Sequence, residues 1–212
     1  MPAAAGNTRR FAPGRDGYRR AVQAAASRPS DVLLLVDVLA DFGHDDGARL
    51  FASFRRTAPA LTEAIAAARA ADVPVIYAND DFGTWAGDRD AVLAEARRRA
   101  PAPDPLDAVA PAAGDAFVMK PRYSAFDHTP LDLLLRERGA ARVLLAGTAT
   151  EMCVAQTAID ARELGYRATV LVAACASVDD RNAALALEYL ERIAGVRLHR
   201  PVGTLPATSE GS

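Results

Sequence analysis

Six short runs of consecutive apolar residues recur along this chain, and longer segments with helix-like spacing separate them. The runs are continuously apolar rather than alternating, which indicates strands covered on both faces, as in a parallel sheet. They occupy residues 32–36, 73–78, 116–119, 143–146, 168–174 and 196–199. The intervening segments predict helices at 49–71, 88–100, 129–138, 152–165 and 180–194, with an additional N-terminal helix at 17–27.

Alternation of strands and helices predicts an α/β fold, a three-layer sandwich with a six-stranded, mostly parallel sheet flanked by helices, in a Rossmann-like arrangement. We expect one domain over residues 17–203, with flexible tails at 1–16 and 204–212, where Ala, Gly, Pro, Ser and Thr dominate. Four prolines predict a long loop within residues 101–115. Gly139, Gly165 and Gly195 each follow a predicted helix, as C-terminal caps do.

Composition narrows the possible partners. The chain has 212 residues and a formal net charge of -2, which gives no electrostatic reason to expect nucleic acid or an anionic membrane as partner. No apolar run approaches the roughly 18 residues of a membrane span, so we expect a cytoplasmic protein. The two cysteines, Cys153 and Cys175, do not form a disulfide framework in a chain of this kind.

Polar residues of types that are common in catalytic sites follow the predicted strands. Asp37 follows the first strand, Asn79 the second and Lys120 the third, while a Gly-Thr-Ala-Thr turn and Cys153 follow the fourth. Because ligands of open parallel sheets bind beyond the carboxyl ends of the strands, we expect these residues to share one edge of the sheet.

Each of these residues also has a purely structural interpretation. Cys153 is compatible with a small buried apolar residue, Asp37 with a helix cap, and Lys120 with a strand-end lysine whose ammonium reaches solvent. Their coincidence at three strand ends favours a reactive cluster. Cys175, which ends an apolar run among Ala and Ser, is interpreted as structural.

A thiol at the start of a helix has a physical reason to be reactive. The helix dipole, the free amides of the first turn and a neighbouring ammonium each lower a thiol pKa, so we expect a lowered pKa for Cys153. Asp37 would accept the thiol proton and Lys120 would hold the negative charges. Backbone N–H groups beside Gly147, where the helix starts, would stabilise an oxyanion.

The residues resemble the isochorismatase-like cysteine hydrolase superfamily, which includes nicotinamidases and N-carbamoylsarcosine amidohydrolases. The resemblance runs from about Val32 to His199. It rests on the apolar strand followed by Asp37-Val-Leu-Ala-Asp-Phe42, on Lys120 in "KPRYSAF", and on Gly147, Thr150, Cys153 and Val154 in "GTATEMCV". Leu39 and Ala40 depart from the usual glutamine and asparagine of the family, so that side of the pocket is expected to be less polar.

This resemblance implies a catalytic triad of Asp37, Lys120 and Cys153. It also implies a cis peptide at Thr148–Ala149 and an oxyanion hole made by the backbone N–H groups of Ala149 and Cys153. Nicotinamidases of the family carry a zinc site built from an Asp and two His near the second strand. This chain has no histidine there, so we expect no metal and no cofactor. Relatives are commonly dimers or tetramers, which implies a homodimer or homotetramer.

The expected activity is hydrolysis of a non-peptide C–N bond, in a small amide or ureide, through a thioester intermediate; the substrates are this small molecule and water. Phe42, Trp85 and Tyr123 are expected to wall the pocket, although aromatic residues also fit a core. Arg122 suits either a substrate carboxylate or solvent, and Asn79 either binds substrate or ends its strand. Two alternatives stay open: an isochorismatase-type ether hydrolase that uses Asp37 alone, and a non-catalytic binder of small molecules.

Overall fold

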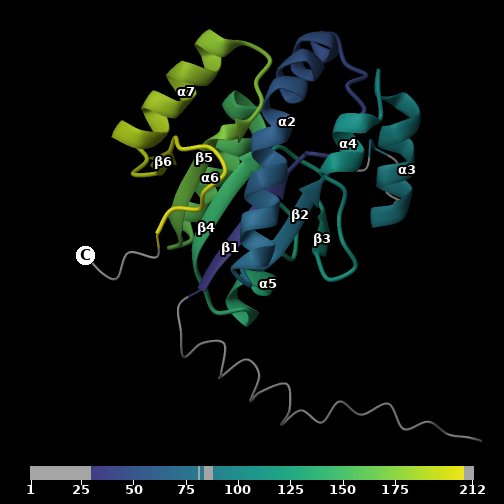
Figure 1. Cartoon of the computed structure of the whole chain (residues 1–212). Helices are drawn as coiled ribbons and strands as arrows, with labels where there is room; N and C mark the ends of the chain where they lie inside the picture. Colours follow the sequence, from purple (N-terminus) through teal and green to yellow (C-terminus); the bar gives the residue numbers. More distant parts are fainter. Residues whose placement is uncertain (1–29, 81, 84–87, 208–212) are drawn as a thin grey trace, which may run out of the picture.

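The computed structural model describes residues 30–80, 82–83 and 88–207 (Figure 1). The helix expected at 17–27, the tail at 1–16 and residues 208–212 lie outside the described residues. The six predicted strands are all present, and they form one sheet. They are β1 (Ser30–Val36), β2 (Val75–Asn79), β3 (Ala116–Met119), β4 (Ala140–Gly147), β5 (Arg167–Cys175) and β6 (Arg197–His199).

The strand order is β3-β2-β1-β4-β5-β6, and every neighbouring pair is parallel. The prediction of a mostly parallel, six-stranded sheet is therefore confirmed. The chain builds outward from β1 to β3 and then returns to place β4 on the other side of β1. This reversal between β1 and β4 creates the crevice in which sheets of this topology bind ligands.

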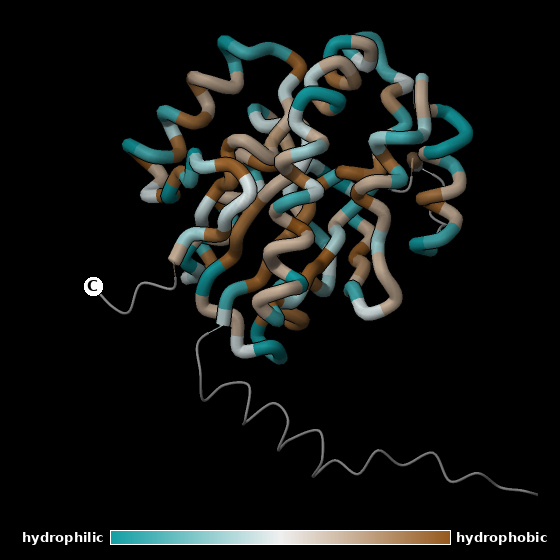
Figure 2. Tube along the Cα trace, viewed as in Figure 1, coloured by the Kyte–Doolittle hydropathy of each residue, from teal (hydrophilic) through white to brown (hydrophobic). Residues whose placement is uncertain are grey.

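Helices cover both faces of the sheet, which explains why the strands are continuously apolar. Leu33 and Leu35 of β1 belong to one core cluster, whereas Val32 and Leu34 belong to the cluster on the opposite face. Figure 2 shows the hydrophobic strands enclosed between the two helical layers. The first layer contains α2 (Gly47–Ala70), α3 (Arg89–Arg99) and α4 (Asp104–Ala108); the second contains α5 (Leu131–Glu137), α6 (Ala155–Glu163) and α7 (Asp180–Arg192).

Two segments differ in detail from the prediction. The proline-rich region expected as a loop contains the short helix α4, whose Leu106 is fully buried against the first core cluster. The helix predicted at 152–165 is divided into a π-helical turn, η1 (Thr150–Val154), and the α-helix α6. Within the described ranges, no helix is both long enough and apolar enough to cross a membrane.

The close approach of β1 and β4 depends on a glycine. Gly147 has a φ of +134° and pairs with Val36 across the two strands. A Cβ atom at this position would lie 2.0 Å from the carbonyl oxygen of Val36, so no larger residue fits without separating the strands. Thr148 follows directly and donates its backbone N–H to the same oxygen.

The end of the described chain is attached to the sheet. The buried side chain of Arg142 forms an ion pair with Asp31 and donates hydrogen bonds to the carbonyl oxygens of Pro206 and Ala207. The domain boundary expected after residue 203 stays a prediction, although these contacts hold the first residues beyond it.

Candidate active site

Asp37, Lys120 and Cys153 lie together at the carboxyl edge of the sheet. The Lys120 Nζ atom is 2.7 Å from Asp37 Oδ2 and 3.6 Å from Cys153 Sγ. The fold thus brings a carboxylate, an ammonium and a thiol into direct contact from positions far apart in the sequence.

Asp37 is held from several sides at the end of β1. Its backbone adopts a φ of +48°, which turns the chain sharply after the strand. Its N–H donates to the Ala78 carbonyl, and its carbonyl accepts a hydrogen bond from the Thr148 hydroxyl. The backbone N–H of Asp80 donates to Asp37 Oδ1 at 3.0 Å, while Oδ2 faces Lys120. The carboxylate is therefore fixed in position before any substrate arrives.

Lys120 is a buried lysine with a full set of partners. Its side chain is 3 % exposed, and Nζ contacts Asp37 Oδ2, Cys153 Sγ and, at 2.8 Å, the carbonyl oxygen of Arg122. An ammonium group has three N–H donors, so these three acceptors use all of them. Burial lowers the pKa of Lys120, but Asp37 and Cys153 raise it by more. The pKa of Lys120 therefore lies above that of an ordinary lysine.

The turn η1 carries Cys153 and is anchored to the strand beside it. Thr150 donates both its backbone N–H and its hydroxyl to the Ala176 carbonyl. Oε1 of Glu151 accepts the backbone N–H groups of Val178 and Asp179, at 2.9 and 3.0 Å. These contacts join the start of η1 to the segment that leads into α7. The peptide bond Thr148–Ala149 is cis, as expected.

The protonation of this cluster differs from the sequence-based expectation. Burial, together with the carboxylate of Asp37, raises the pKa of the Cys153 thiol to about 12, and the opposing effect of Lys120 is smaller. Burial likewise raises the pKa of Asp37 against the effect of Lys120. The expectation of a lowered thiol pKa was wrong because it counted the ammonium and the helix start but omitted desolvation.

The raised thiol pKa makes a testable prediction for alkylation. In a Cys175→Ala variant, which leaves Cys153 as the remaining thiol, iodoacetamide should react slowly near neutral pH. The rate should rise about tenfold per pH unit from about pH 7 to about pH 10, because a thiol with a raised pKa loses its proton only at high pH. Mass spectrometry of the intact protein measures the rate, and a plateau reached below about pH 8 would contradict the prediction.

A cavity of about 660 Å³ opens beside the cluster. Asp37, Lys120, Ala149 and Cys153 line it, and Phe42, Arg122 and Tyr123 line it too, as the sequence analysis expected for pocket residues. Phe42 is buried and packs edge-on against Phe51, so it contributes to the core as well as to the wall. Tyr123 is 56 % exposed at the mouth.

The other two expected pocket residues are Asn79 and Trp85. Asn79 lines the cavity, but its side-chain amide donates to the carbonyls of Leu39 and Asp80 and accepts the Leu39 N–H. It therefore holds the segment after β1 in place, and neither of its N–H donors is left for a substrate. Trp85 lies outside the described residues.

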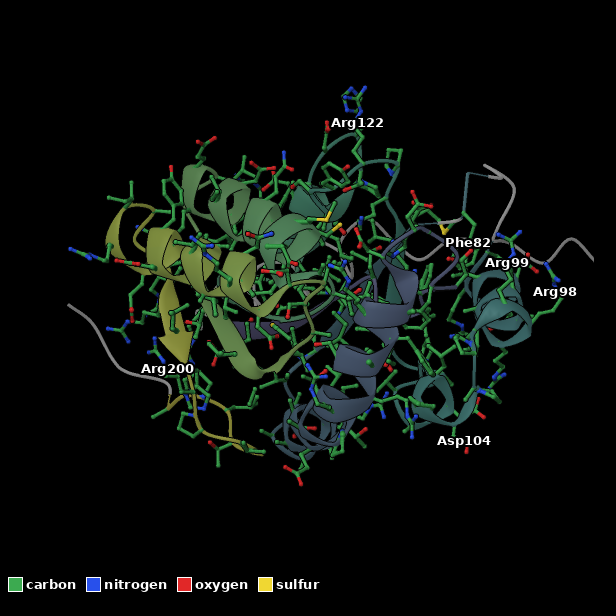
Figure 3. All side chains as sticks on the ribbon, turned by 90° about the horizontal axis from the view of Figure 1, so that it is seen from above. Phe82, Arg98, Arg99, Asp104, Arg122 and Arg200 are labelled. Atoms are coloured by element: carbon green, nitrogen blue, oxygen red, sulfur yellow. The ribbon has the colours of Figure 1, made fainter. Side chains whose placement is uncertain are left out.

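Arg122 takes part in the site through its backbone. Its carbonyl oxygen binds Lys120, whereas its side chain pairs with Asp127 at 3.5 Å and is 66 % exposed. Figure 3 shows the guanidinium extending outward from the molecule. Sequence reasoning did not identify the contributions of this carbonyl, of Thr148 or of Glu151. Backbone acceptors carry no sequence signal, whereas the polar residues of "TATE", which span the start of η1, were the available signal for the other two.

The donor set does not fit a zinc ion. His44 lines the cavity, but His128 contacts Asp127 and His199 contacts Thr204. Asp41, which also lines the cavity three positions before His44, is committed to the Gly43 N–H and to Arg99. Within the part of the chain that the structure describes, no group of three His, Cys, Asp or Glu side chains is arranged to hold a metal ion.

The chain is an α/β protein with an Asp–Lys–Cys cluster at the carboxyl edge of its parallel sheet, and comparison with known protein families identifies its family. Residues 31–200 match the isochorismatase domain. The chain belongs to the isochorismatase family of hydrolases, as the resemblance indicated. An uncharacterized isochorismatase family protein, YaaI of Bacillus subtilis (strain 168), is 31 % identical over 167 residues, which cover 79 % of this chain and 92 % of the relative.

Two solved structures extend the comparison. A nicotinamidase from Staphylococcus aureus superposes with a TM-score of 0.61 and 27 % identity, over 82 % of this chain and 100 % of the other. An N-carbamoylsarcosine amidase from Thermoplasma acidophilum gives a TM-score of 0.61 and 27 % identity, over 81 % of this chain and 96 % of the other. Named members of the family are therefore amidohydrolases.

Proposed function

We propose that this protein hydrolyses a non-peptide C–N bond in a small amide or ureide through a thioester on Cys153. One observation carries the proposal: a buried ammonium lies 2.7 Å from a carboxylate and 3.6 Å from a thiol, all at the wall of one cavity. Burying two charged groups costs free energy unless they are paired. Here the buried pair lies beside a nucleophile, an arrangement typical of functional sites. The amidase activity of the structural neighbours supports the same chemistry.

In the first half-reaction, the Cys153 sulfur attacks the carbonyl carbon while Asp37 accepts the thiol proton. The raised pKa of Asp37 makes it a better proton acceptor than an exposed carboxylate, and direct transfer avoids the need for a thiolate in the free enzyme. The N–H groups of Ala149 and Cys153 stabilise the oxyanion. The C–N bond then breaks, and Asp37 returns the proton to the leaving amine.

In the second half-reaction, water replaces the amine. Asp37 takes a proton from the water as its oxygen attacks the thioester carbon. The C–S bond breaks, and the sulfur regains its proton from Asp37. Lys120 stabilises the negative charge of Asp37 and any charge that develops on the sulfur, and the cluster returns to its starting protonation state after each turnover.

Trapping the acyl-enzyme tests the proposal most directly. A panel of primary amides and ureides is screened for ammonia release, and each active compound is mixed with the protein and quenched in acid. Intact mass spectrometry should then show an adduct equal to the substrate minus ammonia, located on the peptide that contains Cys153. Turnover without any covalent adduct, in a quench fast enough to resolve a single turnover, would contradict the thioester route.

A further inference from the structure

The walls of the cavity beyond the reactive cluster are largely apolar. Ala40, Phe42 and Leu50 come from the segment after β1 and from α2, while Phe82 and Val178 come from two other connections. Leu39 is fully buried in the core, whereas the next residue, Ala40, lines the cavity. A substrate therefore meets apolar surface at these five positions.

The cations of this cavity are already committed. Among the described lining residues, Lys120 and Arg122 are the positively charged ones, apart from the titratable His44. All three donors of the Lys120 ammonium have acceptors within the protein, as described above. The Arg122 side chain extends outward and pairs with Asp127, which is not part of the cavity lining (Figure 3).

Carboxylates outnumber these cations. Besides Asp37, the lining contains Asp41, Asp46, Asp80 and Glu151. Arg99, which stacks over the ring of Phe82 (Figure 3), offsets Asp41. Asp46 makes a loose 3.7 Å contact with the exposed Arg49. Asp80 accepts a hydrogen bond from the Phe82 N–H and forms no ion pair among the described residues. Oε2 of Glu151 is buried and has no hydrogen-bond partner in the described structure.

We propose, building on the proposed function, that this site selects amides or ureides whose acyl group is largely apolar and carries no negative charge, and discriminates against substrates that carry a carboxylate. A substrate carboxylate would enter an already negative cavity with no uncommitted cation among the described lining residues to pair with it. Charges of like sign at about 8 Å in a medium of intermediate dielectric repel by enough to weaken encounter with Cys153 roughly tenfold.

A pair of alkylating reagents tests this selection without an identified substrate. Iodoacetamide is a neutral primary amide, and iodoacetate is its anionic counterpart of nearly the same size; both react with Cys153. In the Cys175→Ala background, the ratio of the iodoacetamide rate to the iodoacetate rate should exceed the ratio for N-acetylcysteine amide in solution by about tenfold. A ratio equal to or below that of the free thiol would overturn the proposal.

Adjacent aspartates provide a matched pair of variants. Both are exposed, but Asp46 lines the cavity and Asp45 does not. Asp46→Lys should lower the rate ratio roughly fivefold, while Asp45→Lys, which changes the net charge equally, should leave it unchanged. An equal effect of both variants would show that the overall charge of the protein, and not this cavity, sets the discrimination.

Arg122→Ala gives an independent check. The alkylation ratio should not change, because the guanidinium points away from the cavity. A selective loss of the iodoacetate reaction would show that Arg122 recruits carboxylates, which would overturn the proposal. Since alkylation does not require turnover, these results stand apart from the test of the thioester route: absence of any hydrolysis would refute the proposed function but not the charge selection.

Discussion

Cys153→Ala is expected to abolish amide hydrolysis, with a loss in kcat of at least about 10⁴-fold. Alanine removes the sulfur that would form the thioester, and no other nucleophilic side chain in the described structure contacts both Asp37 and Lys120. Ammonia release from an amide that the wild-type protein hydrolyses measures the effect.

The control for this variant is Cys175→Ala. Cys175 is buried at the end of β5, with its sulfur 3.9 Å from the Leu145 carbonyl, and it does not line the cavity. This substitution should leave kcat unchanged. If the Cys153→Ala variant instead keeps full turnover, the covalent route is excluded and hydrolysis by Asp37 alone, as in the ether-hydrolase alternative, becomes the better account.

Asp37→Asn should produce two effects of opposite sign. Turnover should fall by about 10³-fold, because an amide cannot accept the thiol proton or return it to the leaving amine. At the same time, Cys153 should react faster with iodoacetamide at neutral pH. The charge of Asp37 raises the thiol pKa, so its removal lowers that pKa while Lys120 stays in place.

Asparagine is a suitable replacement at this position for two reasons. It tolerates the positive φ of residue 37 better than most residues, and its side-chain oxygen can still accept the Asp80 N–H. Asp45→Asn is the matched control and should change neither measurement. Slower alkylation together with lost turnover would indicate a collapsed site rather than the loss of a proton acceptor.

Much of the fold was predictable because each strand has a simple signature. Buried parallel strands are uniformly apolar, so the run Val32–Val36 could be located without knowing its neighbours, and Asp37 marked its end. The shared edge of the sheet then followed from the topology rules. The short helix α4 was missed because its five residues lie among prolines, where a helix-like period cannot be recognised.

The electrostatics of the site were less predictable. The sign of the Cys153 pKa shift depends on how deeply the thiol and Asp37 are buried, and a sequence does not contain that quantity. The role of Asn79 is a second example. Its position at the end of β2 suggested a substrate contact, but its amide binds the backbone of Leu39, a contact between residues that are 40 positions apart.

The cluster and the walls of the cavity come from different parts of the chain. Asp37, Lys120 and Cys153 are held by strand ends and backbone contacts, whereas Ala40, Leu50, Phe82 and Val178 come from connecting segments and from α2. Retargeting this scaffold to a new compound should therefore begin at those four positions, where replacements alter molecular fit and leave the bond-breaking apparatus assembled.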